Sequence, residues 1–171
     1  MTKFRCETCN DEHDLADIAF GADAPAQWDI LTDAERDQSA LTSDQCVIES
    51  SEGKYYFVRA CLDIPILGAD LFFTWGVWVS LSERSFLEIA ERWTDPSRII
   101  AGPYFGWLCT RLPDYPDSMY LRAMLHQRPV GQRPSIELEP SDHPLARDQR
   151  FGVERLIVEQ IVCRLLHQPL S

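Results

Sequence analysis

Three segments rich in aromatic and β-branched residues constrain the fold more than any other part of the sequence. They span residues 46–48, 55–62 and 71–79, and polar stretches containing glycine separate them. Glycine, aspartate and serine are favoured in tight turns, each for its own conformational reason. Short strands joined by such turns pair antiparallel with their neighbours. The sequence therefore predicts a β-meander in the middle of the chain.

Helices are predicted on either side of a second aromatic region. Residues 83–93 and 153–166 each carry apolar side chains at helical spacing. Between them, residues 104–138 contain short aromatic segments that prolines limit in length. Strands and helices that are grouped, without a βαβ rhythm, favour an α+β fold. We expect a curved antiparallel sheet of about six strands, packed against two or three helices, with an N-terminal knuckle.

The chain length and composition favour a single domain. A chain of 171 residues leaves little room for two domains, and 45% apolar residues with 25% charged residues is typical of a globular protein. Residues 1–45 are interpreted as a knuckle followed by short helices, and residues 46–171 as the sheet-and-helix body. We expect both parts to form one domain spanning residues 1–171.

The charge of the chain is negative and unevenly distributed. The formal net charge is −11, and residues 1–52 hold 13 acidic and 3 basic residues. Residues 98–134 instead hold five arginines and two aspartates. Nucleic-acid binding needs a basic face, so we expect no nucleic acid partner. The simplest interpretation of the arginines is that they pair with the acidic first third of the chain.

The sequence shows no signal for a membrane or for secretion. The N-terminal residues lack an apolar core and a small-residue cleavage site, so they do not resemble a signal peptide. The longest apolar stretch, residues 71–81, is too short to span a bilayer. We therefore expect no membrane partner and a cytoplasmic location. In that compartment the six cysteines are expected to be reduced, buried or bound to metal.

The best-defined motif is a pair of cysteines followed by a histidine, Cys6-x2-Cys9-x3-His13. Two thiolates separated by two residues can bind one metal ion across a tight turn, and zinc requires four tetrahedral sulfur or nitrogen ligands. Cys46 is the preferred fourth ligand because it precedes an apolar strand, and His143 is the next choice. The predicted cofactor is therefore zinc. The alternatives are a reduced cysteine pair at a surface turn and a degenerate metal site.

No motif for nucleophilic catalysis, zinc proteolysis or phosphate binding by a glycine-rich loop is present in the sequence. Glu137 and Glu139 would share one face of a strand and could do acid–base work, but a solvated strand face is the better interpretation of the pair. His126 and His143 are possible general bases, although a histidine beside proline more often caps a helix or accepts a hydrogen bond. We therefore predict no catalytic residues.

A cluster of arginine and aromatic residues lies between residues 104 and 133. Its members that we predict to bind a ligand are Trp107, Arg111, Arg128 and Arg133. Such side chains could line a groove for an anionic ligand, an aromatic ligand or an acidic protein segment. The alternative is an internal stack of arginine on aromatic rings.

Several motifs together resemble a known family. They are Cys6-x2-Cys9-x3-His13, Ser43-Asp44-x-Cys46, the strand Trp75-Gly76-Val77-Trp78-Val79, Tyr104-Phe105-Gly106-Trp107-Leu108 and Arg128-Pro129-x3-Arg133-Pro134. The sequence resembles the uncharacterised bacterial proteins known as domain of unknown function number two thousand one hundred and ninety-nine. The resemblance implies a bacterial cytoplasmic protein and supplies no activity. That family usually has glycine after the second cysteine, where this chain has Asn10, a residue that tolerates the left-handed conformation.

Two functional hypotheses follow from these observations. The first is a non-enzymatic module that binds another protein and is stapled by a zinc knuckle. The second is a small-ligand-binding protein or an enzyme that uses the arginine and aromatic residues 104–137. The second hypothesis requires Arg128 and Arg133 to converge in a pocket. The sequence makes no prediction about the oligomeric state.

Overall fold

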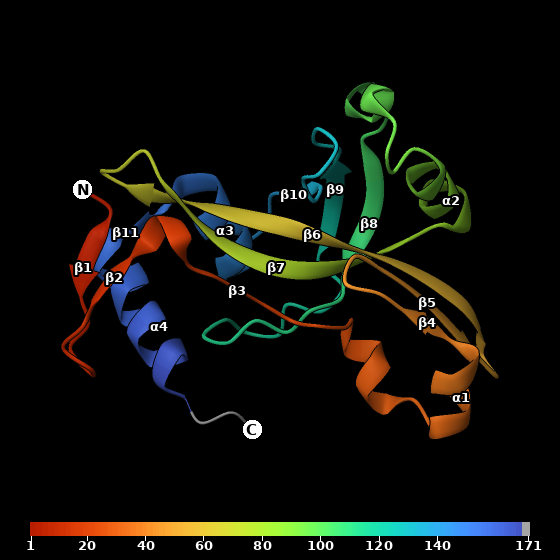
Figure 1. The fold of residues 1–171 in the computed structure, drawn as a ribbon, viewed down its shortest axis with the longest axis horizontal. Coiled ribbons are helices and arrows are strands. Elements are labelled where there is room, and N and C mark those ends of the chain that lie inside the picture. Colours follow the sequence, from red (N-terminus) through yellow and green to blue (C-terminus); the bar gives the residue numbers. More distant parts are fainter. Residues whose placement is uncertain (169–171) are drawn as a thin grey trace.

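The computed structural model describes residues 1–168. A long β-hairpin runs through the centre of the fold (Figure 1). The hairpin consists of β6 (Gly53–Leu67) and β7 (Phe72–Leu81), which pair antiparallel along ten residues, from Tyr56 opposite Leu81 to Pro65 opposite Phe72. Side chains on alternate positions are buried along most of β6, which is the pattern of a pleated strand with one covered face. β5 (Gln45–Ser50) pairs antiparallel with the start of β6, so the predicted meander is confirmed.

Five strands close into a small barrel. The three that complete it are β8 (Tyr104–Leu108), β9 (Arg122–His126) and β10 (Ser135–Leu138). β7 pairs with β8, β8 with β9 and β9 with β10, all antiparallel. The ring closes where β10 meets β6 in a parallel contact, at Ser135 opposite Cys61. A hydrogen bond from the Cys61 N–H to the Pro134 carbonyl, 2.8 Å long, supports this closure.

The predicted sheet was therefore right in class and wrong in form. The fold is α+β, but within residues 1–168 the sheet has nine strands and includes a closed barrel, whereas we expected a curved antiparallel sheet of about six strands. The sheet has more strands than expected because β6 is 15 residues long. One edge of β6 pairs with β7, while its other edge pairs in succession with β5, β10 and β11 (Val153–Glu154). The short strands β3 (Ala19–Gly21) and β4 (Ala40–Leu41) extend the sheet on β7 and β5.

Glycine permits the close approach of β8 to β7 at the barrel. A β-carbon added at Gly106 would lie 2.4 Å from Val79 Cγ1 and 2.5 Å from the Ser80 carbonyl oxygen. Neither contact is tolerable, so a larger residue would push the two strands apart.

Four α-helices and three 3₁₀ helices pack around this sheet within residues 1–168. They are η1 (Leu15–Asp17), η2 (Ala26–Ile30), α1 (Asp33–Gln38), α2 (Glu83–Glu91), η3 (Pro96–Ile100), α3 (Pro144–Phe151) and α4 (Arg155–His167). The capping box of Thr32 and Glu35 begins α1, as the sequence predicts. In α2, Phe86 and Ile89 are buried, which confirms the apolar stripe expected there.

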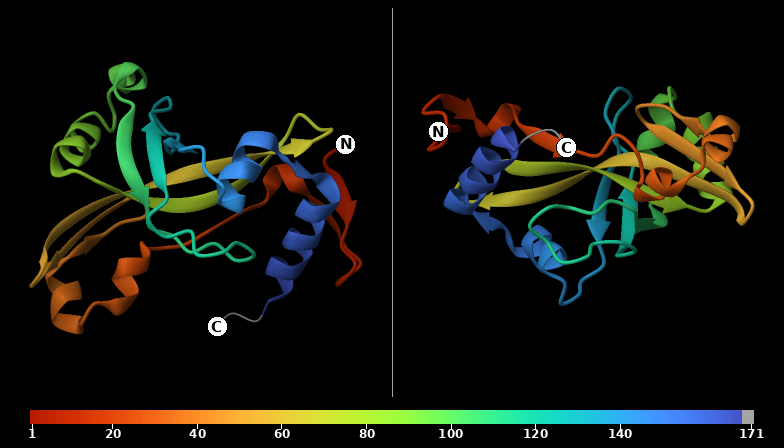
Figure 2. Two further views of the ribbon diagram at one scale, coloured as in Figure 1. Left: turned by 180° about the vertical axis from the view of Figure 1, so that it is seen from behind. Right: turned by 90° about the horizontal axis from the view of Figure 1, so that it is seen from below.

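The buried side chains form two clusters. The larger cluster lies between the hairpin and helices α2, α3 and α4 and includes Trp75. The smaller cluster contains Cys46, Ile48, Phe57, Trp78 and Cys109, with residues of η2 packed against it. Figure 2 shows that η2 and α1 lie at one end of the hairpin, whereas α3 and α4 lie at the other.

The N-terminal hairpin and the last described helix lie side by side. The N-terminal hairpin of β1 (Lys3–Arg5) and β2 (Glu12–Asp14) runs beside α4 in both Figure 1 and Figure 2. The guanidinium group of Arg155 donates hydrogen bonds to the carbonyls of Met1 and Lys3, the latter at 2.7 Å. Among residues 1–168, none of the helices has the length and apolar character needed to cross a membrane.

Candidate metal centre

A tight turn between β1 and β2 brings the two cysteines of the knuckle together. The N–H of Asn10 donates to the Cys6 carbonyl, and the N–H of Cys6 donates to the Asp11 carbonyl, both at 2.9 Å. Asn10 has a φ of 62°, so the residue after the second cysteine adopts the left-handed conformation that glycine would favour. The turn predicted from the sequence is therefore present.

The pairing of β1 with β2 places the first histidine. His13 lies opposite Phe4 in the register of the hairpin, and the two rings are 5.8 Å apart. From this position the His13 Nε2 atom lies 3.3 Å from the Cys9 Sγ atom. Local sequence spacing and strand pairing are thus sufficient to bring three of the predicted ligands together.

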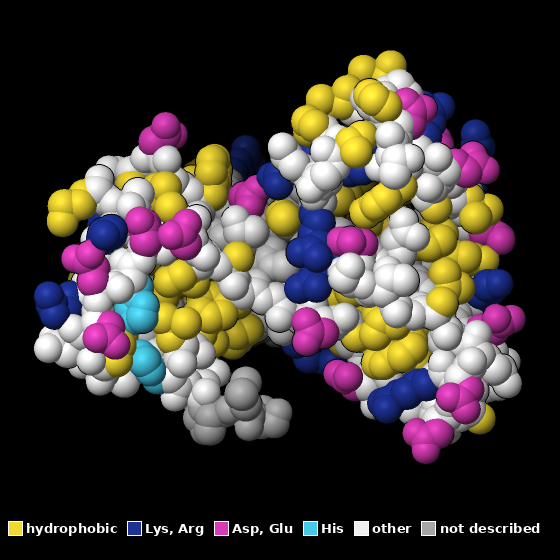
Figure 3. All heavy atoms as spheres, in the orientation of Figure 1, with side chains coloured by type: hydrophobic (Ala, Val, Ile, Leu, Met, Phe, Trp, Pro, Cys, Tyr) yellow, Lys and Arg dark blue, Asp and Glu magenta, His cyan; other side chains and the backbone are white. Residues whose placement is uncertain are grey.

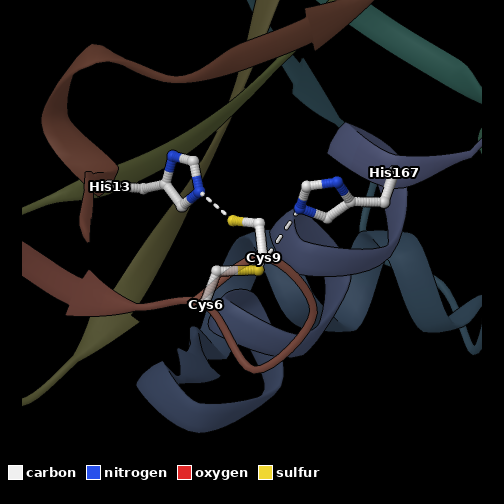
Figure 4. Close-up of side chains that lie close together, drawn as sticks. All are labelled: Cys6, Cys9, His13 and His167. Atoms are coloured by element: carbon white, nitrogen blue, oxygen red, sulfur yellow. Dashed lines mark hydrogen bonds between the residues drawn. The ribbon is translucent and has the colours of Figure 1, made fainter. Parts of the chain in front are cut away.

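The fourth residue comes from the opposite end of the chain. His167, the last residue of α4, places its Nε2 atom 3.4 Å from the Cys6 Sγ atom. Figure 4 shows the two cysteines lying between the imidazole of His13 on one side and that of His167 on the other. The four ligand atoms of Cys6, Cys9, His13 and His167 all lie within 4.8 Å of one another. This group could hold a metal ion.

The distances fit a tetrahedral ion bound by two sulfur and two nitrogen atoms. Bonds of about 2.3 Å to sulfur and about 2.0 Å to nitrogen separate neighbouring ligand atoms by about 3.5 Å. The two sulfur–nitrogen distances in the cluster, 3.3 and 3.4 Å, match that separation closely. The remaining pairs of ligand atoms lie within 4.8 Å of one another and would move closer together around an ion.

The electrostatic environment favours a thiolate at Cys6. Burial raises the pKa of the Cys6 thiol, but hydrogen bonds to its sulfur outweigh this effect and lower the pKa to about 5. The donors, in decreasing order of effect, are the Cys163 thiol, the backbones of Cys9 and Thr8, and His167. Cys6 is thus prepared to act as a ligand, because thiolates and not thiols bind metals.

The other two sulfurs respond to the charge on Cys6. A backbone hydrogen bond at Asp11 lowers the pKa of Cys9, but burial and the Cys6 sulfur together outweigh it, so the net shift is upward. Burial, followed by the hydrogen bond to Cys6, raises the pKa of Cys163, which lies one helical turn before His167. A second thiolate is therefore costly beside the first. A divalent cation would remove that cost because it attracts both.

Cys46 does not belong to this site, which corrects the predicted ligand set. It lies on β5 in the smaller core cluster, with 1% of its surface exposed, and faces Phe57 and Trp78. Burial raises the pKa of its thiol to about 12. The alternative ligand His143 is also elsewhere, because its Nδ1 atom accepts a hydrogen bond from the Leu145 N–H at the start of α3.

Sequence reasoning missed His167, although a signal was present. Cys163 and His167 are four residues apart at the end of the last helix, and that spacing places both on one helix face. Cys163 is half-buried and directed at the knuckle, and the histidine that follows it completes the cluster.

The predicted ligand-binding residues separate into three places. Arg128 and Arg133 line one cavity, whereas Trp107 lines a different, apolar groove and Arg111 is exposed beside Asp117. Arg128 pairs with Asp63, and Arg133 Nε lies 2.7 Å from Asp44, so the structure pairs both with acids of other segments.

A stack of arginine on aromatic rings is present, but it lies at the barrel surface, whereas the alternative interpretation predicts it in the interior. The guanidinium group of Arg122 lies 5.2 Å from the ring centre of Phe105 and 5.7 Å from that of Trp107. Arg122 also pairs with Glu139 at 2.9 Å, while Glu137 lies 3.5 Å from His126 on the exposed face of β10 and β9. Both glutamates are exposed to solvent, Glu137 on β10 and Glu139 directly after it.

The fold and the cluster define an α+β protein whose terminal segments could together hold a metal ion. The chain belongs to the family described as "uncharacterized protein conserved in bacteria" (DUF2199), which matches residues 5–153. The family resemblance inferred from the sequence is thereby confirmed. Comparisons with curated proteins and with solved structures found no match. Cys6, Cys9 and His13 lie within the matched residues, and His167 lies beyond them.

Proposed function

We propose that this protein is a non-enzymatic binding module in which a zinc ion ties the N-terminal hairpin to the C-terminal helix. The observation that carries the proposal is the composition of the cluster. Two sulfur and two nitrogen atoms lie within 4.8 Å of one another and come from both ends of the chain. Such a tetrahedral set of thiolates and imidazoles selects zinc among the common divalent ions.

The same set supports a structural and not a catalytic role for the ion. Catalytic zinc sites use three protein ligands and keep the fourth position for water or substrate. Here four side chains of the protein would fill the tetrahedron, and Cys6 is fully buried. An ion held in this way joins β1, β2 and α4, because it bonds Cys6 and Cys9 in the turn, His13 on β2 and His167 on α4.

Elemental analysis of protein purified without chelator tests the zinc centre. About one zinc per chain is expected in the wild type and in Cys46→Ala, since Cys46 lies in a separate core cluster. Cys6→Ser should lose the metal, and His167→Ala should retain less zinc than the wild type. A wild type without metal contradicts the proposal, and so does a Cys46→Ala variant that loses zinc as completely as Cys6→Ser.

An apolar groove beside the barrel supports binding to a protein. The groove has a volume of about 630 Å³ and lies between η2 and the strands β5, β6 and β8. We name it the apolar groove; its apolar and aromatic lining residues are Ile30, Leu31, Ile48, Tyr55, Phe57, Trp107 and Tyr120. Ile30 is 82% exposed and Trp107 is 41% exposed, although both are large and apolar. Exposed aromatic and aliphatic side chains gathered in one place are typical of protein-binding surfaces.

The charges around the apolar groove indicate the kind of partner. α1 and its flanking segment carry Asp29, Asp33, Glu35 and Asp37, and Glu52 lines the groove itself. Figure 3 shows hydrophobic side chains exposed near η2 and β5, with acidic and basic side chains beside them. The proposed occupant is a segment of a partner protein that inserts an apolar anchor and carries lysine or arginine beside it.

A peptide selection tests the apolar groove. Peptides selected from a random library against the wild type should share a large apolar residue with a nearby basic residue. Their affinity should fall at least about tenfold in Ile30→Asp, since a charge replaces an anchor contact. Ile100→Asp is the matched control, because Ile100 is 83% exposed but lies on η3, away from the groove. Peptides that bind Ile30→Asp as well as the wild type would contradict the proposal.

A further inference from the structure

A cavity rich in arginine lies apart from both the metal centre and the apolar groove. It has a volume of about 510 Å³, and its charged lining residues are Arg98, Arg128, Arg133 and Asp44. We name it the arginine cavity. In Figure 3 a column of basic side chains crosses the middle of the molecule, with a few acidic ones beside it.

Positive charge exceeds negative charge around this cavity. Asp63 and Asp44 pair with Arg128 and Arg133 respectively, which leaves Arg98 without a carboxylate. Arg59 adds a further positive charge close to Cys61 in the cavity wall. Among residues 1–168, no carboxylate oxygen lies within 4.0 Å of the Arg59 or Arg98 side chains. Four guanidinium groups therefore share two carboxylates.

Arg98 is the residue that marks the cavity as a built site. Its side chain is 1% exposed, and its terminal nitrogens donate to the carbonyls of Trp93 at 2.7 Å and Gln132 at 2.8 Å. The guanidinium carbon lies 5.0 Å from the ring centre of Trp93, while Nε has no hydrogen-bond partner. Carbonyl groups and a ring hold the arginine in place but supply no net negative charge. Burial of a charge without a counter-charge costs free energy. An anion bound beside Arg98 would reduce that cost.

Arg128 and Arg133, at the mouth of the cavity, have N–H donors that their aspartate partners do not use. Arg133 binds Asp44 through Nε alone, and Arg128 binds Asp63 through one terminal nitrogen. Each guanidinium group carries five N–H donors in a planar fork. The remaining donors of both groups are thus available to a ligand, and the two aspartates hold the side chains in position.

We propose that the arginine cavity binds a small molecule through a phosphate group. Guanidinium groups bind the paired oxygens of a phosphate in a bidentate manner, and several of them around one cavity match a doubly charged tetrahedral anion. The oxyanion would neutralise Arg98 from the cavity side and accept hydrogen bonds from Arg128 and Arg133. This site is independent of the zinc centre, because it shares no residue with it.

Calorimetric titration of the purified protein with inorganic phosphate and pyrophosphate tests the proposal. The ionic strength is kept constant with chloride, so that general screening does not imitate binding. Saturable binding is expected, and Arg128→Gln and Arg133→Gln should each weaken it at least about tenfold, since each loses charge-assisted hydrogen bonds. Arg111→Gln is the control, because Arg111 is exposed and lies outside the cavity.

A variant that is expected to bind phosphate more tightly distinguishes a change in binding from a defect in folding. Asp44→Asn keeps an oxygen that can accept the hydrogen bond holding Arg133 in position, but it removes a negative charge that repels an anion, so phosphate affinity should rise several-fold. A merely destabilised protein would not bind more tightly. Arg98→Met should abolish the increase in melting temperature that phosphate causes in the wild type; where this variant does not fold, the other three decide.

Three outcomes would overturn the proposal. The first is the absence of saturable binding of both phosphate and pyrophosphate by the wild type. The second is equal binding by Arg133→Gln and Arg111→Gln. The third is tighter binding of citrate than of either phosphate compound, which would assign the cavity to carboxylates.

Discussion

Cys6 and Cys46 are both buried, yet the structure gives their thiols opposite chemistry. In the candidate metal centre, hydrogen-bond donors surround the Cys6 sulfur and outweigh burial, so its pKa falls to about 5. In the smaller core cluster, apolar neighbours alone surround the Cys46 sulfur, and its pKa rises to about 12. The comparison teaches that burial does not decide whether a cysteine can bind metal. The donors and imidazoles aimed at the sulfur decide it.

Removal of the metal should change the stability of the protein more than any other perturbation. The change should depend on Cys6 and not on Cys46. An ion that binds the folded state alone stabilises it by about 4 kcal/mol when its free concentration is a thousand times its dissociation constant. A strong chelator should therefore lower the melting temperature of the wild type by many degrees. Calorimetry with and without chelator measures the change.

The control for metal removal is Cys6→Ser, which should melt at the same temperature with and without the chelator. Hydrogen exchange adds a local readout, because the end of α4 should lose protection when the ion no longer bonds His167. An unchanged melting temperature in the chelated wild type would show that the cluster carries no stabilising ion.

Loss of the fourth ligand should have the next largest effect. His167→Ala leaves three ligands, so the zinc affinity should fall at least about 100-fold, which corresponds to about 2.7 kcal/mol. Competition with a zinc-binding dye measures the affinity. His126→Ala is the matched control, because His126 lies on β9 beside Glu137 and outside the cluster. Equal affinities of the two variants would mean that the C-terminal helix takes no part in the centre.

The parts of the fold that depend on local sequence could be predicted. The hairpin of β6 and β7 follows from apolar segments separated by a glycine turn, and α1 follows from its capping box at Thr32. Barrel closure could not be predicted, because it depends on how β10 meets β6 at Cys61. Nothing in either strand alone specifies that contact, since the second edge of a long strand can pair with any strand that reaches it.

The candidate metal centre also has a part that could be predicted from local sequence and a part that could not. Cys6, Cys9 and His13 lie close in sequence, so one turn and one strand pairing bring them together. The fourth ligand depends on tertiary structure. Cys46 seemed suitable because it was expected to precede an apolar strand, but it lies within β5, and the register that pairs it with Phe57 turns its side chain into the core. A shift of one residue would have turned it outward, which is a property of the pairing and not of the composition.

Substitutions at Cys46 should have the smallest effect on the free energy of unfolding. They test the comparison between Cys6 and Cys46 at the cysteine that is expected not to bind metal. Cys46→Ala removes one buried sulfur and should cost about 1 kcal/mol of unfolding free energy through the small cavity that remains. Cys46→Ser should cost more, about 2 kcal/mol, because it places a hydroxyl group in a pocket of apolar side chains. Urea denaturation with saturating zinc and with chelator measures both costs. Each cost should be the same in the two conditions, since Cys46 and the metal centre are separate sites and distant substitutions add. A cost that appears only when zinc is present would couple Cys46 to the metal and undo the distinction between the two kinds of cysteine.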